Sequence, residues 1–144
     1  MYLDSAIVVK LLVPEADSSF YAGLVDGQVA WTAEIALAEC YSALLRKERE
    51  GAVSSRQRRA AWKQMESDVA ARRISLVGIN LSVIHSANSI MTRCHPRIPL
   101  RSLDAIHLAA SAECASWPLC TADARMRAAA ERMGFAMTPL PESD

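Results

Sequence analysis

The chain has 144 residues, of which 51% are apolar and 6% aromatic, and its 16 basic and 16 acidic side chains give a formal net charge of zero. This length predicts one domain with a single hydrophobic core, and the composition suits helices packed on a sheet. Zero net charge argues against a protein that holds nucleic acid mainly through a general positive field, although it leaves local recognition open.

Three other features of the chain bear on its location. No uninterrupted apolar run reaches the roughly 18 residues that span a membrane. The N-terminus lacks the basic start of a signal peptide. The four cysteines form no Cys-x-x-Cys pair and lie mostly in apolar segments, so we expect reduced thiols rather than disulfides or a zinc site. The sequence therefore predicts a cytoplasmic protein without a membrane span.

Short apolar segments alternate with segments that suit helices. In chain order we expect a strand over residues 1–4, helices over 5–13 and 18–24, a strand over 29–32, helices over 33–50 and 55–73, a strand over 74–79, helices over 81–94 and 103–114, a strand over 119–121, a helix over 123–133 and a strand near 135–138.

Polar residues set the starts of several of these helices. Thr32, Asn80, Ser102 and Asp123 each stand before or at the beginning of an apolar helical segment, where a side-chain oxygen can accept hydrogen bonds from unpaired backbone N–H groups. Gly51 ends the long helix that begins near residue 33.

The alternation of strands and helices predicts an α/β fold with a central, mainly parallel sheet of about five strands, covered by helices on both faces. We expect one domain over residues 1–138 and a loose tail over 139–144. Sheets of this kind place their ligands in the crevice beyond the carboxyl ends of the strands.

Four acidic residues lie within otherwise apolar segments. Asp4 ends the first expected strand, and Asp123 follows the fourth. Glu39 lies in Ala-Leu-Ala-Glu-Cys-Tyr and Asp104 in Ser-Leu-Asp-Ala-Ile-His, both near the starts of expected helices. Because strand ends and the following helix starts share one edge of a parallel sheet, we expect these four carboxylates to meet.

A cation would explain such a meeting. An unpaired carboxylate is costly to bury unless it is neutralised or binds a cation. The helix dipole contributes only about 0.3–1 kcal/mol to each acid. Carboxylates without Cys or His select hard cations, meaning Mg²⁺, Mn²⁺ or Ca²⁺, so we predict that Asp4, Glu39, Asp104 and Asp123 hold such a cation at a catalytic site. Open carboxylate sites that hold Mg²⁺ usually complete the coordination shell with substrate phosphates.

Two hydroxyls flank these acids. Ser5 follows Asp4, and Thr121 lies two residues before Asp123. Either hydroxyl could position a carboxylate or the scissile phosphate, or could make ordinary capping and turn hydrogen bonds.

The acids also have ordinary structural interpretations. Asp123 suits a helix N-cap, and Arg101, three residues before Asp104, could pair with that carboxylate. His107 lies on nearly the same helix face as Asp104, so it could support the acids, although a core or interface role is favoured.

Most basic residues are arginine, the side chain suited to bidentate phosphate contact. They form three clusters, namely Arg46, Lys47 and Arg49, then Arg56, Arg58 and Arg59, then Arg72 and Arg73. A solvated helix face explains any single cluster equally well, so RNA binding by these clusters stays open at this point.

Four segments in this order resemble the PIN-domain family, and specifically the VapC toxins of bacterial toxin–antitoxin pairs. They are Tyr-Leu-Asp-Ser-Ala with Asp4, Ala-Leu-Ala-Glu-Cys-Tyr-Ser-Ala-Leu with Glu39, Arg-Ser-Leu-Asp-Ala-Ile-His-Leu-Ala with Asp104, and Cys-Thr-Ala-Asp-Ala-Arg-Met with Asp123. The resemblance extends from residue 2 to about residue 138. Ala6 departs from it, because many relatives have Ser or Thr there.

This resemblance implies a three-layer α/β/α fold and a Mg²⁺- or Mn²⁺-dependent endoribonuclease. It carries over Asp4, Glu39, Asp104 and Asp123 as the acidic quartet, and Ser5 and Thr121 as supporting hydroxyls. It also implies an RNA substrate, a homodimer, and a cognate antitoxin whose C-terminal segment blocks the acidic pocket.

Three other interpretations compete with the nuclease. A phosphate-accepting signalling domain would need a Lys after the last strands, and the lysines are Lys10, Lys47 and Lys63. A haloacid-dehalogenase-like phosphatase would need a second acid two residues after Asp4, where Ala6 stands. The stronger alternative is a non-catalytic module of the same fold that binds RNA or protein.

Overall fold

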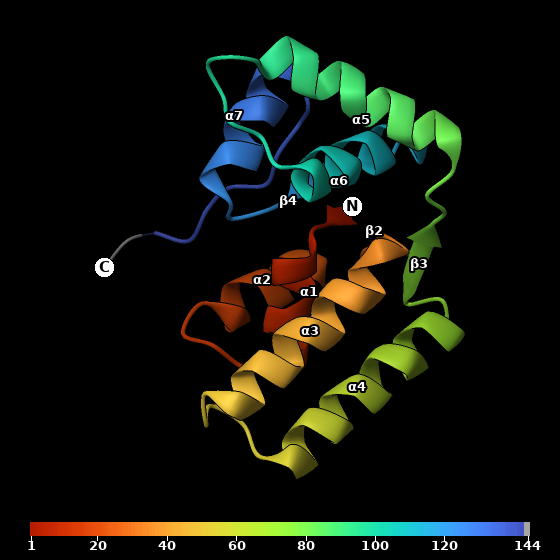
Figure 1. Ribbon diagram of the computed structural model, residues 1–144. Helices are drawn as coiled ribbons and strands as arrows, with labels where there is room; N and C mark the ends of the chain where they lie inside the picture. Colours follow the sequence, from red (N-terminus) through yellow and green to blue (C-terminus); the bar gives the residue numbers. More distant parts are fainter. Residues whose placement is uncertain (143–144) are drawn as a thin grey trace.

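A four-stranded parallel sheet forms the middle layer of the protein, whose computed structural model describes residues 1–142 (Figure 1). The strands are β1 (Tyr2–Leu3), β2 (Ala30–Ala33), β3 (Ile74–Val77) and β4 (Leu119–Cys120), in the spatial order β3-β2-β1-β4. Parallel neighbours need crossover connections, and helices supply them here.

Seven helices cover the two faces of this sheet in the described part of the chain. They are α1 (Ser5–Leu12), α2 (Ser18–Val25), α3 (Ile35–Arg49), α4 (Ser55–Ala70), α5 (Leu81–Cys94), α6 (Ser102–Glu113) and α7 (Ala124–Met133). Figure 1 shows α1 to α4 on one side of the sheet and α5 to α7 on the other. None of these helices has both the length and the apolar character needed to cross a membrane.

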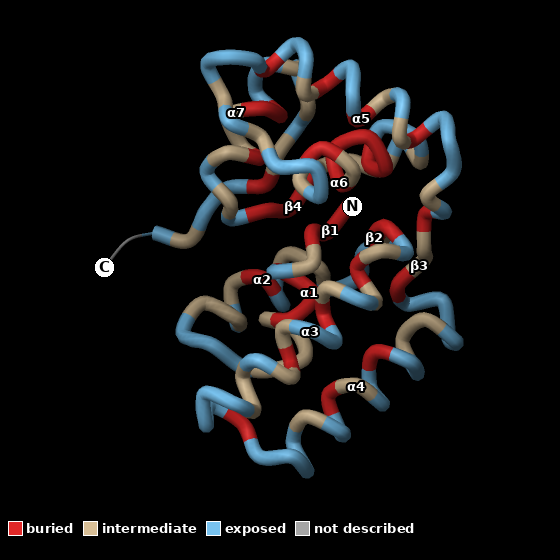
Figure 2. The backbone as a smooth tube through the Cα atoms, viewed as in Figure 1, coloured by how far each residue is buried: buried red, intermediate tan, exposed pale blue. Residues whose placement is uncertain are grey.

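Each strand contributes side chains to both hydrophobic cores, as the period of two in a strand requires. Tyr2 and Leu119 pack into the core beneath α5, α6 and α7, whereas their neighbours Leu3 and Cys120 pack into the core beneath α1 to α4. The buried residues therefore lie along the middle of the molecule on both sides of the sheet (Figure 2). Burial of both faces of the sheet explains why the strand sequences are continuous apolar runs.

The predicted α/β class, with helices on both faces of a parallel sheet, is confirmed. The segment near 135–138, expected as a strand, contributes one bridge between Leu119 and Met137. Residues 139–142 of the expected tail form neither helix nor strand, while 143–144 lie outside the described residues. The domain limit at residue 138 stays a prediction.

Two predicted helix caps are wrong by one or two residues. Thr32 belongs to β2, and its hydroxyl donates to the Leu3 carbonyl at 2.8 Å rather than accepting from a helix. The N-cap position of α3 falls at Glu34 because β2 continues to Ala33. Ser102 is the first helical residue of α6, so the capping position there belongs to Arg101.

Strands β1 and β4 bring two of the predicted site residues to the same edge of the sheet. The two strands pair in register, and the Asp4 N–H donates to the Cys120 carbonyl at 3.2 Å, immediately beyond the last strand residues. Helices α1 and α7 follow these strands after the short segments that carry Asp4 and Asp123. The carboxyl edge of the sheet therefore carries two acids, Asp4 and Asp123, on adjacent strand ends.

Candidate active site

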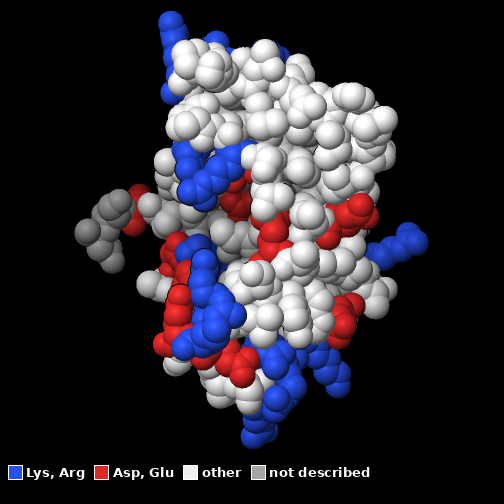
Figure 3. Space-filling view, viewed as in Figure 1, with Lys and Arg blue, Asp and Glu red and all other residues white. Residues whose placement is uncertain are grey.

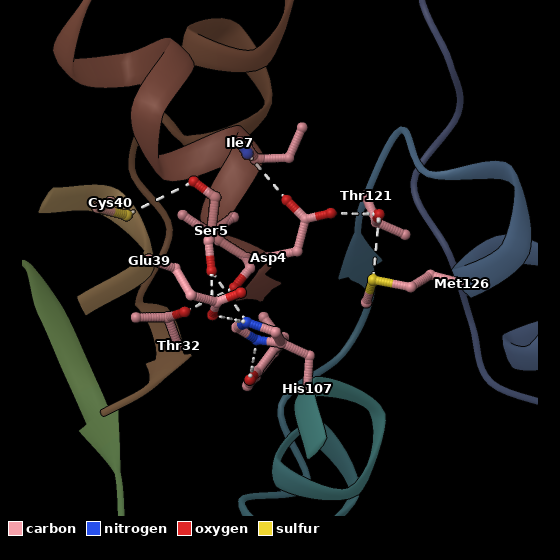
Figure 4. Close-up of polar contacts among 11 residues, drawn as sticks. Asp4, Ser5, Ile7, Thr32, Glu39, Cys40, His107, Thr121 and Met126 are labelled. Carbon is pink, nitrogen blue, oxygen red and sulfur yellow. Dashed lines mark hydrogen bonds and ion pairs between the residues drawn. The ribbon is translucent and has the colours of Figure 1, made fainter. Parts of the chain in front are cut away.

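The carboxylate of Asp4 is fixed by two hydrogen bonds. Its Oδ1 accepts from the Ile7 N–H at 2.8 Å, which caps α1, and its Oδ2 accepts from the Thr121 hydroxyl (Figure 4). Only 4% of Asp4 is exposed, and burial raises the pKa of its carboxyl, while the bonds from Thr121 and Ile7 act in the opposite direction. Asp4 is therefore a rigid, poorly solvated acid.

Thr121 links the two strand ends. Its hydroxyl donates to Asp4 and accepts from the Asp123 N–H at 3.1 Å. The Thr121 side chain is fully buried. This hydroxyl therefore fixes the position of Asp4 relative to the turn that carries Asp123.

Asp123 caps α7, as its place after β4 predicts. Its Oδ1 accepts from the N–H groups of Arg125 and Met126 at 2.8 and 3.0 Å, and its Oδ2 lies 3.7 Å from the Arg125 guanidinium. The capping interpretation therefore accounts for one oxygen of this carboxylate, and the second faces a cation from its own helix.

Asp104 lies in the first turn of α6, and its Oδ2 accepts from the Arg101 N–H at 3.2 Å. The pair expected from their spacing is thus a bond to the backbone, since no side-chain ion pair joins them within residues 1–142. Partial burial raises the pKa of Asp104, and the nearby charge of Asp123 adds to the increase.

The negative charge of Asp123 also contributes to raising the pKa of Asp4, after the larger effect of burial. Asp123 therefore acts on both Asp4 and Asp104. The three acids come from different elements, and the charge of Asp123 reaches the other two.

Glu39 joins this edge through Ser5 and His107. The Ser5 hydroxyl donates to Glu39 Oε1 at 2.6 Å, and His107 Nε2 lies 2.7 Å from the same oxygen (Figure 4). Burial alone would raise the pKa of Glu39, but the hydrogen bonds from His107 and Ser5 hold it below its usual value. Glu39 is therefore a stabilised carboxylate, in contrast to Asp4 and Asp104.

Two of these contacts could not be read from the sequence. Ser5, expected beside Asp4, bonds Glu39 of α3 instead. Tyr2 completes the cluster, with its hydroxyl 2.8 Å from His107 Nδ1. The only sequence signal was the position of His107 three residues after Asp104, whereas Tyr2 looked like any strand residue.

A groove passes over Glu39. One pocket of about 560 Å³ is lined by Ser5, Glu39, Asp123 and basic residues from α1, α3 and the segment before α6, namely Lys10, Arg46, Lys47 and Arg101. A second pocket of about 450 Å³ shares Glu39 and Arg46 with the first and reaches Leu103. Figure 3 shows acidic atoms in a hollow at the middle of this face, with Lys and Arg on its flanks. Asp4 and Asp104 line neither pocket.

The donor set suits a hard cation because its free ligands are carboxylate oxygens. Glu39 Oε2 and Asp104 Oδ1 accept no hydrogen bond within residues 1–142. No group of three His, Cys, Asp or Glu side chains in that range is close enough together to hold a metal ion. Mg²⁺ commonly takes one or two carboxylates and completes its shell with water and substrate phosphate, so the residues present fit it in that open form.

The family model of the PIN domain matches residues 1–132, so the chain belongs to the PIN domain family. This finding confirms the resemblance to the PIN-domain family, and the resemblance to VapC toxins stays a prediction. Members of this family are generally metal-dependent nucleases, which places the chain among hydrolases of the nuclease type. No curated protein matches the chain.

Proposed function

We propose that this protein is a Mg²⁺- or Mn²⁺-dependent endoribonuclease that acts as the toxin of a toxin–antitoxin pair. The observation that carries the proposal is the hydrogen-bonded link from Asp4 through Thr121 to the turn that carries Asp123, beside a groove lined by Glu39 and Asp123. The charge of Asp123 adds to the cost of ionising Asp4 and Asp104, and this arrangement is unfavourable unless the acids serve a positive ligand.

Each acid would have its own role at the site. Glu39 and Asp104 have free oxygens that can take the cation, while Asp4 and Asp123 supply negative charge that raises its affinity. When bound, such an ion would supply an activated water and hold the scissile phosphate. Ser5 and Thr121 keep Glu39 and Asp4 in place during the reaction.

Two arginines flank the groove with the guanidinium available to RNA. Arg46 is exposed and lies 4.0 Å from Glu50, which is a weak contact, and Arg101 has no ion-pair partner among residues 1–142. The lysines there are engaged, because Lys10 and Lys47 both bind Glu15, at 2.8 and 2.7 Å. Arg46 and Arg101 are therefore the side chains we expect to contact RNA phosphates.

The remaining partners come from the resemblance to VapC toxins. We propose a cytoplasmic homodimer bound by a cognate antitoxin that covers the acidic groove. Sedimentation of the purified chain measures the dimer directly, and inhibition of cleavage by the product of a neighbouring gene measures the antitoxin.

The central test is cleavage of structured RNA by the purified chain with Mg²⁺, with Mn²⁺ and with EDTA. We expect metal-dependent cleavage that falls at least about a hundredfold in Asp4→Asn and Asp104→Asn, because each change removes a negative charge from the site. Wild-type rates in both variants would exclude the acidic site. Metal-independent RNA binding without cleavage would instead support the non-catalytic module.

A further inference from the structure

His107 lies buried between two polar groups that come from different elements. Its Nδ1 is 2.8 Å from the Tyr2 hydroxyl in β1. Its Nε2 is 2.7 Å from Glu39 Oε1 in α3 (Figure 4). Only 3% of His107 is exposed, and Tyr2 is fully buried. Both ring nitrogens are thus engaged away from solvent.

The direction of these hydrogen bonds follows from Glu39. A carboxylate oxygen accepts and does not donate, so we assign the ring hydrogen of His107 to Nε2, which donates to Glu39 Oε1. The Ser5 hydroxyl lies 2.9 Å from Nε2 and uses its own hydrogen for the same Glu39 oxygen, so towards Nε2 it can only accept. Nδ1 of His107 then accepts from the Tyr2 hydroxyl.

Only one of the two Glu39 oxygens is used by these contacts. Oε1 accepts from Ser5 at 2.6 Å and from His107 at 2.7 Å, whereas Oε2 has no hydrogen-bond partner within residues 1–142. Glu39 lines both pockets of the groove. The protein therefore occupies one oxygen and leaves the other for a ligand.

We propose that Tyr2 and His107 form a positioning relay that holds Glu39 by Oε1 and presents Oε2 to the cation, a proposal that rests on the metal site of the proposed function. His107 is the positioning residue, and the Tyr2 hydroxyl holds its other ring nitrogen. Partners of this kind fix the orientation of a metal-binding side chain, and their loss typically weakens metal affinity by about 10- to 100-fold.

Two substitutions separate the relay from a packing role. In His107→Gln the amide NH₂ can replace Nε2–H and still donate to Glu39, whereas in His107→Asn the shorter amide lies near Nδ1, where its oxygen can accept from Tyr2. We expect His107→Gln to keep Mn²⁺ affinity within about threefold of wild type. We expect His107→Asn to lose about tenfold or more.

Mn²⁺ binding is measured without RNA, from the electron paramagnetic resonance signal of free Mn²⁺. In cleavage assays at saturating Mn²⁺, KM for RNA should stay unchanged in both variants. Ser111→Ala is the matched control, because Ser111 is buried one turn further along α6 and its hydroxyl donates to the Leu108 carbonyl. We expect it to change thermal stability and leave Mn²⁺ affinity unaltered.

If either variant fails to fold, the unaltered protein still allows a test, because the ring nitrogen of His107 that carries hydrogen can be identified directly. A long-range ¹H–¹⁵N spectrum of the imidazoles should show His107 protonated at Nε2 only, with assignment by replacing the exposed His85 and His95 by Gln. Protonation at Nδ1 alone would overturn the relay.

The relay would also be overturned by equal Mn²⁺ affinity in His107→Asn and wild type, or by a His107→Gln variant that binds Mn²⁺ as weakly as His107→Asn.

The relay and the proposed nuclease function can fail separately. Wild-type chain that binds Mn²⁺ but cleaves no RNA contradicts the nuclease, while the variants still decide the relay. Wild-type chain that binds no Mn²⁺ contradicts both.

Discussion

At the scale of single residues, Asp4 and Glu39 show how one site can hold two acids in opposite ways. Asp4 accepts two hydrogen bonds and still has a raised pKa, because burial outweighs them. Glu39 is more exposed, and His107 and Ser5 lower its pKa despite partial burial. The ionised form of Asp4 therefore costs stability, whereas the ionised form of Glu39 contributes to it.

The sign of the Asp4 shift predicts how Asp4→Asn changes stability with pH. A carboxyl whose folded pKa lies above its unfolded value of about 3.9 leaves the folded state unaffected at lower pH and destabilises it as pH rises through the folded pKa. We therefore expect Asp4→Asn, in EDTA, to unfold at a higher temperature than wild type at pH 8, and this advantage to shrink towards pH 4.

Thermal unfolding by circular dichroism measures both proteins across this range. Addition of Mg²⁺ should then stabilise wild type more than the variant, because a ligand that binds only the folded state raises its stability. An advantage of Asp4→Asn that stays constant from pH 4 to pH 8 would show that the carboxylate carries no burial cost.

The sequence points to single acids more readily than to their surroundings. Charged residues in apolar segments are visible as single positions, and Asp4, Glu39, Asp104 and Asp123 were selected that way; their catalytic role stays a prediction. The Tyr2–His107–Glu39 chain joins β1, α6 and α3, so it depends on distances between elements that no local pattern contains. Tertiary contacts of this kind become readable only once the sheet order is known.

At the scale of elements, helix starts were predicted wherever a side chain performs the capping. Asn80 accepts from the Val83 N–H at the start of α5, and Ser54 does the same for Gln57 in α4. At α3 and α6 no side chain of the N-cap residue caps the helix, and the expected caps Thr32 and Ser102 missed the boundary. The packing of β2 against β3 determines the first of these boundaries instead.

Asp123 caps helix α7 and is also a proposed site residue, and substitutions can separate these two roles. Asparagine caps a helix about as well as aspartate, whereas alanine loses about 0.5–2 kcal/mol of stability. We expect Asp123→Asn to keep its unfolding free energy while RNA cleavage falls. Asp123→Ala should lose both, as urea unfolding and a cleavage assay on each variant would reveal.

Ser54→Ala is the control for capping alone, since Ser54 caps α4 on the other side of the molecule from α7. It should lose a similar amount of stability and keep full activity. Full activity in Asp123→Asn would limit Asp123 to its capping role.

At the scale of the whole molecule, zero net charge makes RNA binding depend on where the charges lie. Of the three basic clusters in the sequence, only the one in α3 lines the groove over Glu39. Arg58 of the second cluster bonds Glu48, and Arg73 of the third bonds Asp68 at 2.6 Å. The fold thus places one basic flank beside the acids and commits part of the other clusters to surface ion pairs.

This distribution predicts a local, salt-dependent contribution of Arg46 and Arg101. Removing both side chains in the double variant Arg46→Ala with Arg101→Ala should raise KM for RNA and leave kcat at saturating RNA nearly unchanged. The slope of log affinity against log salt should fall by about 1.4, or about 0.7 for each lost phosphate contact.

The double variant Arg56→Ala with Arg59→Ala is the matched control. Both side chains are exposed in α4 and line neither pocket, and their removal takes away the same total charge. Binding to RNA should be measured from 50 to 300 mM salt with EDTA present, which separates the arginines from the cation. Equal slopes in the two double variants would mean that RNA responds to the charge of the whole protein and not to the groove.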